Sequence, residues 1–253
     1  METIMKSNVD KLIQQLKSEK AAKYKNGIYH FTQTSLAYNS NRIEGSKLSH
    51  EHTINLFNTH TLLSNGDEVI DSNDIIETMN HFRAFDYILQ NYNTPLSEDL
   101  VKHLHKILKN NTTDADYDWF NVGEYKSLAN TIGDQETCPP DMVPQKMQKL
   151  IQNYLNLPQH DFHSLLKFHV DFESIHPFQD GNGRVGRLVL FKECLNYDII
   201  PFIIDHEHKL FYYRGLHEFY REPGYLTDTC LSAQDKYIAY CRHLVKDFIS
   251  KIL

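Results

Sequence analysis

The sequence lacks the features that would place a 253-residue chain in a membrane, in a secretory pathway or on nucleic acid. No stretch approaches the roughly 18 consecutive apolar residues of a membrane-spanning helix, so we expect no membrane partner. Residues 1–20 are too charged for a secretory signal, because they contain no apolar core. The formal net charge of −7 argues against a nucleic-acid partner, which would normally require a basic domain.

Cysteine is scarce and is not arranged for metal binding. The four cysteines form no C-x-x-C pair; they are Cys138, Cys194, Cys230 and Cys241. We therefore expect reduced thiols and a cytoplasmic location. Histidine is abundant, and HEH occurs twice, at His50–His52 and His206–His208. Neither copy has metal-ligand spacing on a recognisable scaffold, so we expect surface histidines there.

Glycine and proline are also few, with ten and eight residues, and we find no internal repeat or low-complexity linker. Apolar residues instead recur at helical spacing along most of the chain, which predicts an all-α protein. Asp74 and Glu77 form a capping pattern, and Ser97 precedes two acidic residues, so Asp74 and Ser97 should each begin a helix. The other predicted helices span residues 4–16, 28–43, 143–157, 162–175, 184–196, 208–221 and 232–252.

One segment, GEYKSLANTIGDQETCPP at residues 123–140, breaks the helical pattern. Extended-type residues flank a Gly-Asp turn and two prolines follow, which predicts a short β-hairpin on the helical body. A surface loop between helices is equally compatible with this sequence. The fold class is all-α in either case.

SIHPFQDGNGRVGRL, residues 174–188, interrupts the most hydrophobic region of the chain with polar groups. His176 and Pro177 should end the preceding helix, because proline disfavours helical backbone at the residue before it. Phe178 suits an apolar anchor that packs the loop onto the core. Asp180 offers an oxygen ligand to a hard cation such as Mg²⁺.

The second half of this stretch could bind an anion. Gly181 and Gly183 flank Asn182, so the backbone can turn its N–H groups inward at the start of the next helix. Arg184 and Arg187 are three residues apart and share one face of that helix. Two guanidinium groups beside a cation ligand suit a di- or triphosphate better than a simple carboxylate.

His176 is the only group in this stretch able to accept a proton from a hydroxyl at neutral pH. A base, a metal ligand and a phosphate site so close in sequence suggest phosphoryl or nucleotidyl transfer to a hydroxyl. The stretch is not a Walker A loop, because G-x-x-x-x-G-K is absent. An ordinary helix–loop–helix with a glycine-rich turn is the competing interpretation.

HPFQDGNGRVGR, residues 176–187, resembles the signature H-x-F-x-(D/E)-G-N-G-R-x-x-R of the Fic (filamentation induced by cAMP) family and meets every defined position. The resemblance covers roughly residues 30–225 and implies a Fic-type helical bundle with a short β-hairpin flap. The regions it implies are an N-terminal helix (1–27), an inhibitory-helix region (28–65), a Fic core (66–225) and a C-terminal helix (226–253).

The resemblance also implies an activity and the residues that perform it. Fic enzymes transfer AMP from MgATP, with Mg²⁺ as cofactor, to a Ser, Thr or Tyr hydroxyl of a target protein. By this resemblance His176 would be the general base, Asp180 the Mg²⁺ ligand and Phe178 the hydrophobic anchor. The residues that would bind the nucleotide are Gly181, Asn182, Gly183 and Arg184 at the α- and β-phosphates, Arg187 at the γ-phosphate and Tyr213 beside the adenine.

Two further features concern binding of the target protein and contact with the adenine base of the nucleotide. In the flap, Thr131, Ile132 and Gly133 would align a target segment by strand addition. Some Fic relatives contact the base with an Asn seven residues after the position of Tyr213, where this chain has Tyr220. Transfer of another phosphate-linked group, such as UMP or phosphate, therefore stays open.

SNRIEG, residues 40–45, places Glu44 at the end of a predicted helix, where a negative charge opposes the helix dipole. Gly45 looks like a helix-ending glycine, and Ser40 lies on the same face as Glu44. An exposed glutamate beside a cap is one interpretation, and a cationic partner for Glu44 is the other. The segment matches the Fic inhibitory motif (S/T)-x-x-x-E-(G/N). This match implies that Glu44 pairs with Arg187 in the place of the γ-phosphate and makes the protein self-inhibited.

Other functions and partners stay open. A hydrolase of the same fold could use Glu44 to position water and remove AMP from a target. A nucleotide-binding regulator with negligible turnover is a third reading, although the intact His176 counts against it. The partner would be an unknown target protein or the protein itself. Residues 1–27 and 226–253 could contact a second copy in a homodimer or pack within the chain.

Overall fold

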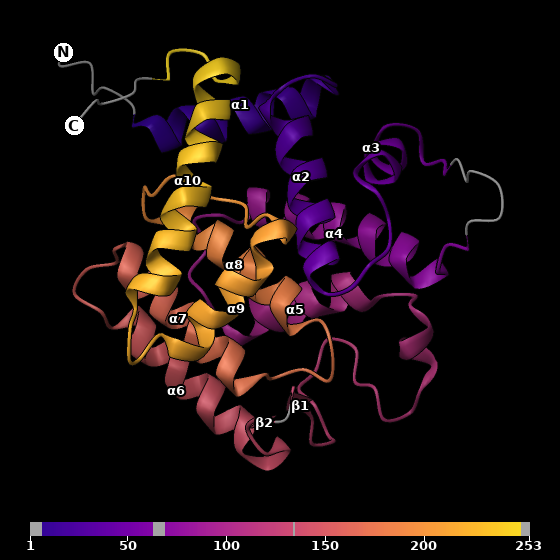
Figure 1. The fold of residues 1–253 in the computed structure, drawn as a ribbon, viewed down its shortest axis with the longest axis vertical. Helices are drawn as coiled ribbons and strands as arrows, with labels where there is room; N and C mark the ends of the chain where they lie inside the picture. Colours follow the sequence, from indigo (N-terminus) through magenta and orange to yellow (C-terminus); the bar gives the residue numbers. More distant parts are fainter. Residues whose placement is uncertain (1–6, 63–68, 134, 249–253) are drawn as a thin grey trace.

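The structure is a computed structural model of the chain and describes residues 7–62, 69–133 and 135–248. Within these residues it contains ten α-helices, three short 3₁₀ helices and one two-stranded hairpin, so the predicted all-α class is confirmed (Figure 1). The α-helices are α1 (Asn8–Ala22), α2 (Ile28–Ile43), α3 (His50–Thr59), α4 (Ser72–Gln90), α5 (Glu98–Lys109), α6 (Val143–Leu155), α7 (Phe162–Ile175), α8 (Asn182–Asn196), α9 (Lys209–Glu218) and α10 (Gly224–Leu244). The 3₁₀ helices are η1 (Thr113–Asp116), η2 (Pro140–Met142) and η3 (His206–His208).

Helix α8 lies at the centre of the core (Figure 1). Every residue from Asn182 to Leu195 is buried, as in a helix surrounded by protein on all sides. Helices α2, α4, α5 and α7 pack against it. The glycine-rich stretch of the sequence therefore lies at the N-terminal end of a central helix, where several elements converge.

The sequence predicts two helix starts from capping patterns, and one is correct. The side chain of Ser97 caps α5 by accepting a backbone hydrogen bond from its first turn at 3.1 Å. The predicted start at Asp74 is wrong, because Asp71 is the N-cap of α4. Glu77 does not complete a cap; its carboxylate instead pairs with two buried basic side chains.

Two predicted helices have limits that lie far from those in the structure. The sequence predicts the last helix at residues 232–252, whereas α10 starts at Gly224 and ends at Leu244. Pro223 is its N-cap residue, and the fixed φ of proline suits a helix start. The helix predicted at residues 4–16 corresponds to α1, which continues to Ala22; residues 4–6 lie outside the described residues.

Helix α3 has no counterpart among the predicted helices, because its sequence HEHTINLFNT has only a short apolar face. Ser49 and His52 form its capping box: His52 N–H donates to Ser49 Oγ at 3.1 Å, and Ser49 N–H donates to His52 Nδ1 at 3.4 Å. His52 is buried, so the expectation of a surface histidine is wrong at this position. His50 and His208 are exposed.

Both terminal helices pack within the chain. Leu12 and Leu16 of α1 are fully buried, and α1 packs against α2. Helix α10 packs against α9, α7 and α2. A buried hydrogen bond of 2.7 Å joins Tyr237 Oη of α10 to Thr32 Oγ1 of α2.

The predicted hairpin is present and short. Strand β1 (Thr131–Ile132) pairs antiparallel with β2 (Gln135–Glu136), and Gly133 in the turn adopts a φ of 57°. The segment before β1 is braced by Lys126, whose Nζ donates to Asn130 Oδ1 at 2.7 Å.

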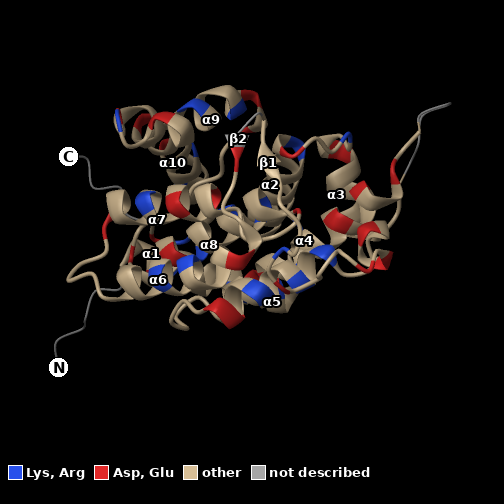
Figure 2. Cartoon of the chain, turned by 90° about the horizontal axis from the view of Figure 1, so that it is seen from below, with Lys and Arg blue, Asp and Glu red and all other residues tan. Residues whose placement is uncertain are grey.

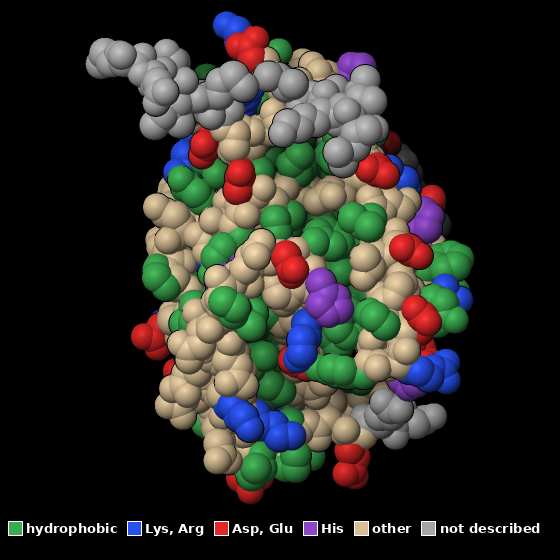
Figure 3. Space-filling view, turned by 90° about the vertical axis from the view of Figure 1, so that its left-hand side faces the viewer, with side chains coloured by type: hydrophobic (Ala, Val, Ile, Leu, Met, Phe, Trp, Pro, Cys, Tyr) green, Lys and Arg blue, Asp and Glu red, His purple; other side chains and the backbone are tan. Residues whose placement is uncertain are grey.

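The surface carries mixed charge. Figure 2 shows Lys and Arg interspersed with Asp and Glu along the helices in view. In Figure 3, hydrophobic side chains lie in several separate groups, with acidic side chains spread among and around them. Of the helices in the described part of the chain, none is both long enough and apolar enough to cross a membrane.

Candidate active site

His176 ends helix α7 at the entrance to the glycine-rich loop. Its backbone is left-handed, with a φ of 52°, and its N–H donates to Phe172 O at 3.0 Å, which closes the helix. The ring Nδ1 lies 3.4 Å from Glu173 O, so an Nδ1–H can donate there and leave the Nε2 lone pair for a substrate. Burial lowers the pKa of His176, which keeps the ring neutral and able to accept a proton at pH 7.

Phe178 and Asn182 hold this loop against the core. Phe178 is fully buried, and its ring stacks on that of His105 with centroids 4.0 Å apart and planes 2° apart. Asn182 Oδ1 accepts from Phe178 N and Asn182 Nδ2 donates to Phe178 O, both at 2.8 Å. The side chain of Asn182 is thus engaged by the loop, so its contribution to a phosphate site would be its backbone N–H.

Replacing Phe178 with alanine is expected to lower the free energy of unfolding by about 3–5 kcal/mol, because loss of a fully buried ring leaves a cavity. Phe178→Leu keeps most of the apolar volume and should lose less than half as much. Urea denaturation at pH 7 measures both values. Phe211→Ala, at a phenylalanine that is 52% exposed, is the matched control. A loss below about 1 kcal/mol for Phe178→Ala would show that the ring does not anchor the loop.

His105 belongs to the site although it lies outside the sequence motif. Its Nδ1 accepts from Gly123 N at 2.9 Å, so its Nε2 carries the hydrogen and donates to Asp180 O at 3.1 Å. Burial and the Lys109 ammonium lower the pKa of His105 to about 3, which keeps the ring neutral. The available sequence signal was its position one helical turn after Val101, on the apolar face of the predicted helix.

The N-terminus of α8 offers backbone donors to an anion. Gly181 is the N-cap residue with a φ of 80°, and no side chain within the described ranges caps this end. The N–H groups of residues 182–184 have no intrahelical acceptor. Glu44 lies against this turn, since a Cβ on Gly183 would come within 2.1 Å of Glu44 Oε1. The absence of a side chain at Gly183 lets the carboxylate approach this closely.

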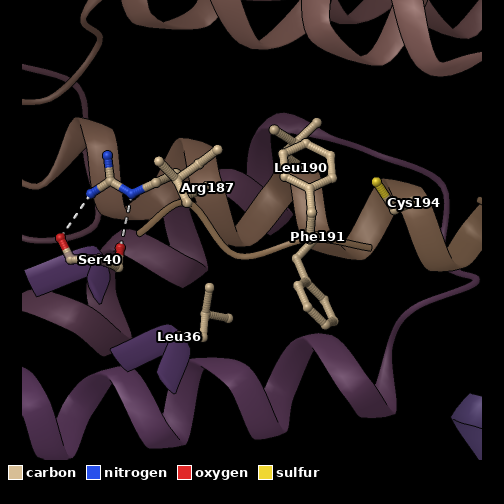
Figure 4. A pocket seen from close by; sticks show the side chains of 8 residues that line it. Leu36, Ser40, Arg187, Leu190, Phe191 and Cys194 are labelled. Carbon is tan, nitrogen blue, oxygen red and sulfur yellow. Dashed lines mark hydrogen bonds between the residues drawn. The ribbon is translucent and has the colours of Figure 1, made fainter. Parts of the chain in front are cut away.

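Arg187 joins α8 to the C-terminal end of α2. Its Nη2 donates to Glu44 Oε1 at 2.6 Å and to Ser40 O at 3.0 Å, and its Nε donates to Ser40 Oγ at 3.0 Å. Figure 4 shows the two bonds to Ser40 beside a small, mainly apolar pocket. Burial would lower the pKa of Arg187, but the charge and hydrogen bond of Glu44, together with Tyr212 and Glu173, raise that pKa overall. Gly45, with a φ of 104°, follows Glu44 as a helix-ending glycine.

Tyr213 and Tyr220, the two tyrosines discussed in relation to the adenine base, lie in different places. Tyr213 Oη donates to Ile43 O at 3.2 Å, so Tyr213 lies at the end of α2 beside Glu44. Burial and the Glu44 charge raise the pKa of Tyr213 to about 12. Tyr220 is 68% exposed, and its hydroxyl bonds to Asp171 on the surface of α7.

Asp180 belongs to a charge network that the motif alone does not reveal. Lys109 Nζ donates to Asp180 Oδ2 at 2.7 Å, and also to Glu77 Oε1 at 2.6 Å and Asp114 Oδ2 at 2.8 Å. Arg184 Nη2 donates to Asp180 Oδ2 at 3.0 Å, and its Nη1 pairs with Glu77. Three carboxylates and two cations from α4, α5, η1, the loop and α8 therefore meet at one point.

Asp180 fits a magnesium ion that also contacts phosphate. Burial would raise the pKa of Asp180, but Arg184 and Lys109 outweigh burial and hold that pKa well below its usual range, so the carboxylate is charged. Both hydrogen bonds from these cations reach Oδ2, so Oδ1 can bind an ion. Mg²⁺ in phosphoryl-transfer sites typically uses one or two carboxylates, water and substrate phosphates. The residues present therefore fit a Mg²⁺ ion whose other ligands include phosphate oxygens.

The flap lies beside this loop. Lys126 N donates to Pro177 O at 2.9 Å. Asn130 Nδ2 donates to Phe178 O at 3.0 Å. Strand β1 and Gly133 are exposed. The structure thus places a short exposed strand next to the loop that starts at His176.

Glu173 is a buried acid three residues before His176. Its Oε1 has no hydrogen-bond partner among the residues described, and a Cβ on Gly186 would come within 2.4 Å of it. Burial raises the pKa of Glu173 to about 8; Arg187 lowers it and Glu44 raises it further. The carboxyl is therefore mostly protonated at neutral pH.

Wild-type stability should fall relative to Glu173→Gln as the pH rises from about 4.5 to about 8. Over this interval the folded protein retains a proton on Glu173 that the unfolded chain has lost, so raising the pH favours unfolding. The limiting slope is about 1.4 kcal/mol per pH unit. Urea denaturation of both proteins at four pH values measures the difference, and a difference that stays constant with pH would show that Glu173 titrates normally.

The chain matches known proteins in sequence. Residues 95–193 match the model of the Fic/DOC family. Over 181 residues the chain is 30% identical to a probable protein adenylyltransferase from Aquifex aeolicus, a match that covers 66% of this chain. It covers 51% of that relative, so this chain spans about half the relative's length.

Solved structures match the fold. A Fic domain containing signaling protein from Bacteroides thetaiotaomicron superposes with a TM-score of 0.68 at 25% identity, covering 94% of this chain and 91% of that one. Fic-1 (residues 134–508) from C. elegans superposes with a TM-score of 0.67 at 16% identity, covering 93% of this chain and 73% of that one. At this identity the match shows similarity of fold alone. The sequence match contains the loop from His176 and most of α8, and the fold match extends over nearly the whole chain. The chain therefore belongs to the Fic/DOC family.

Proposed function

We propose that this protein transfers AMP from MgATP to a Ser, Thr or Tyr hydroxyl of a target protein, or of itself, and that Glu44 inhibits the transfer. The observation that carries the proposal is the 2.6 Å ion pair of Glu44 with Arg187, at the donor-rich start of α8. A carboxylate there occupies a site suited to a phosphate. The name of the Aquifex aeolicus relative supports the same chemistry.

The proposed reaction is a displacement at the α-phosphorus of ATP. The target hydroxyl oxygen bonds to the α-phosphorus while His176 Nε2 takes its proton, and the bond to the bridging oxygen breaks, so pyrophosphate leaves. The N–H groups of residues 182–184, with Arg184 and Arg187, would stabilise charge on the phosphates. Mg²⁺ held by Asp180 would neutralise phosphate charge when bound.

Glu44 and the γ-phosphate would compete for Arg187. Arg187 Nη2 already donates to Glu44 and to Ser40 O, and Nε donates to Ser40 Oγ. While Glu44 is docked, the γ-phosphate cannot take its place beside Arg187. The α-phosphate of bound ATP would then be poorly aligned with a hydroxyl at His176, and misalignment is costly for in-line transfer.

A second function, removal of AMP from a modified protein, is supported by the nearness of Glu44 to the base. Burial lowers the pKa of His176, and the Glu44 charge opposes that shift. In this hydrolysis the oxygen of a water held by Glu44 would bond to the phosphorus while the Glu44 carboxylate takes the water's proton. The bond from phosphorus to the target oxygen would break, and that oxygen would take a proton from the protonated form of His176, leaving free AMP and the target hydroxyl.

ATP labelled at either the α- or the γ-phosphate distinguishes these functions. Glu44→Gly protein is incubated with Mg²⁺ and each ATP, alone and with a cell extract as a source of targets. AMP transfer predicts protein-bound label from the α-position only. Label from the γ-position would indicate phosphate transfer, and label from α-labelled UTP would indicate UMP transfer. Release of AMP from a modified protein by wild type, but not by Glu44→Gly, would indicate the hydrolase.

A further inference from the structure

Lys109 is an enclosed charge at the edge of the proposed nucleotide site. Its side chain is 1% exposed, and its ammonium donates to Glu77, Asp114 and Asp180 at 2.6–2.8 Å. The ring of Phe120 lies 5.3 Å from Nζ. An ammonium has three donors, and each has a carboxylate acceptor here.

The cluster around Lys109 has the composition of a cation site that is already filled. One oxygen from each of the three carboxylates lies within 4.8 Å of the others, close enough for a single ion to reach all three. The Lys109 ammonium is bonded to all three instead, and Arg184 adds a second positive charge. A divalent ion entering among these carboxylates would face two positive charges at short range.

Helix α5 holds Asp180 through two residues one turn apart. His105 Nε2 donates to the main-chain oxygen of Asp180 at 3.1 Å, and Lys109 Nζ donates to its side-chain Oδ2 at 2.7 Å. The backbone and the carboxylate of Asp180 are therefore both fixed from the same helix face.

We propose that Lys109 is a resident cation. It positions the Asp180 carboxylate and excludes free divalent ions from the cluster, so that Mg²⁺ binds Asp180 only together with nucleotide phosphates. Lys109 and Arg184 both use Oδ2, so a metal at Oδ1 needs further negative ligands, which phosphates provide. The nucleotide in this proposal rests on the proposed function, whereas cation exclusion by Lys109 is measured without any nucleotide.

The test is a titration with Mn²⁺ in the absence of nucleotide. Binding is measured as the loss of the electron paramagnetic resonance signal of the free ion. Wild type should leave Mn²⁺ free up to about 1 mM, because the cluster has its own cation. Lys109→Met should bind Mn²⁺ at least about tenfold more tightly, since three carboxylates lose their ammonium. Lys109→Met/Asp180→Asn should lose this gain. Lys106→Met, at an exposed lysine of the same helix, should behave as wild type.

A balanced variant covers the case in which Lys109→Met does not fold. Lys109→Gln/Asp114→Asn removes one charge of each sign and should show a smaller gain that still depends on Asp180. The proposal is overturned if wild type binds Mn²⁺ as tightly as the folded Lys109 variants, or if those variants show no gain. Failure of AMP transfer in Glu44→Gly, with the expected Mn²⁺ behaviour in the Lys109 variants, would instead overturn the proposed function.

Discussion

Glycine in place of Glu44 is expected to raise the initial rate of AMP transfer by about a hundredfold or more, because the variant loses the carboxylate that pairs with Arg187 and covers Gly183. The pair is only partly buried, since the side chain of Arg187 is 5% exposed and that of Glu44 is 30% exposed. A hundredfold increase in rate corresponds to about 2.7 kcal/mol, because about 1.4 kcal/mol is worth tenfold. The γ-phosphate would gain the freed donors. The measurement is the rate at which label from α-labelled ATP appears on protein.

Two variants separate the charge of Glu44 from other effects. Glu44→Gln keeps the length of the side chain without its charge, and should give part of the increase. Glu207→Gln, at an exposed glutamate of η3, should leave the rate unchanged. A folded Glu44→Gly protein with the wild-type rate would contradict inhibition by Glu44.

Removing the His176 imidazole from the Glu44→Gly variant should cause the largest decrease in the rate of AMP transfer. Glu44→Gly/His176→Ala is expected to transfer AMP about a thousandfold more slowly than Glu44→Gly, within the range of general-base contributions. ATP affinity should be retained, because the phosphate donors lie on α8 and on its arginines. Initial rates at saturating MgATP, with calorimetry of ATP binding, measure both properties.

The control for His176 is another histidine of the same helix. His163→Ala, at an exposed position near the start of α7, should keep the Glu44→Gly rate. If Glu44→Gly/His176→Ala kept more than about a tenth of that rate, His176 would not be the base. Loss of ATP binding in the same variant would point to a structural role.

Helices α2 and α7 could be predicted to their end residues because their signals are local. Apolar spacing fills residues 28–43 and 162–175, and the end signals Gly45 and Pro177 lie just beyond each helix. The ion pair of Glu44 with Arg187 joins residues far apart in sequence. The sequence predicts this ion pair only because two short motifs, residues 40–45 and residues 176–187, can each be recognised separately and together imply it.

The charge cluster around Asp180 could not be predicted in this way. Lys109, Glu77 and Asp114 lie on three separate elements and meet only when α4 and α5 pack around the start of α8. Glu77 also carried a misleading local pattern with Asp74, and tertiary ion pairs override that pattern. No periodicity or spacing in the sequence indicates that these side chains come together.

Helix α2 carries Glu44 at its end, and most of its residues are buried in the core. If Glu44 inhibits transfer as proposed, folding of the core would deliver one inhibitory carboxylate to each site. This one-to-one ratio would not change on dilution, unlike inhibition by a separate protein. Under that proposal, release would come from a change within a single molecule, such as unwinding of the last turn from Ser40 to Glu44 while the rest of the helix stays in place.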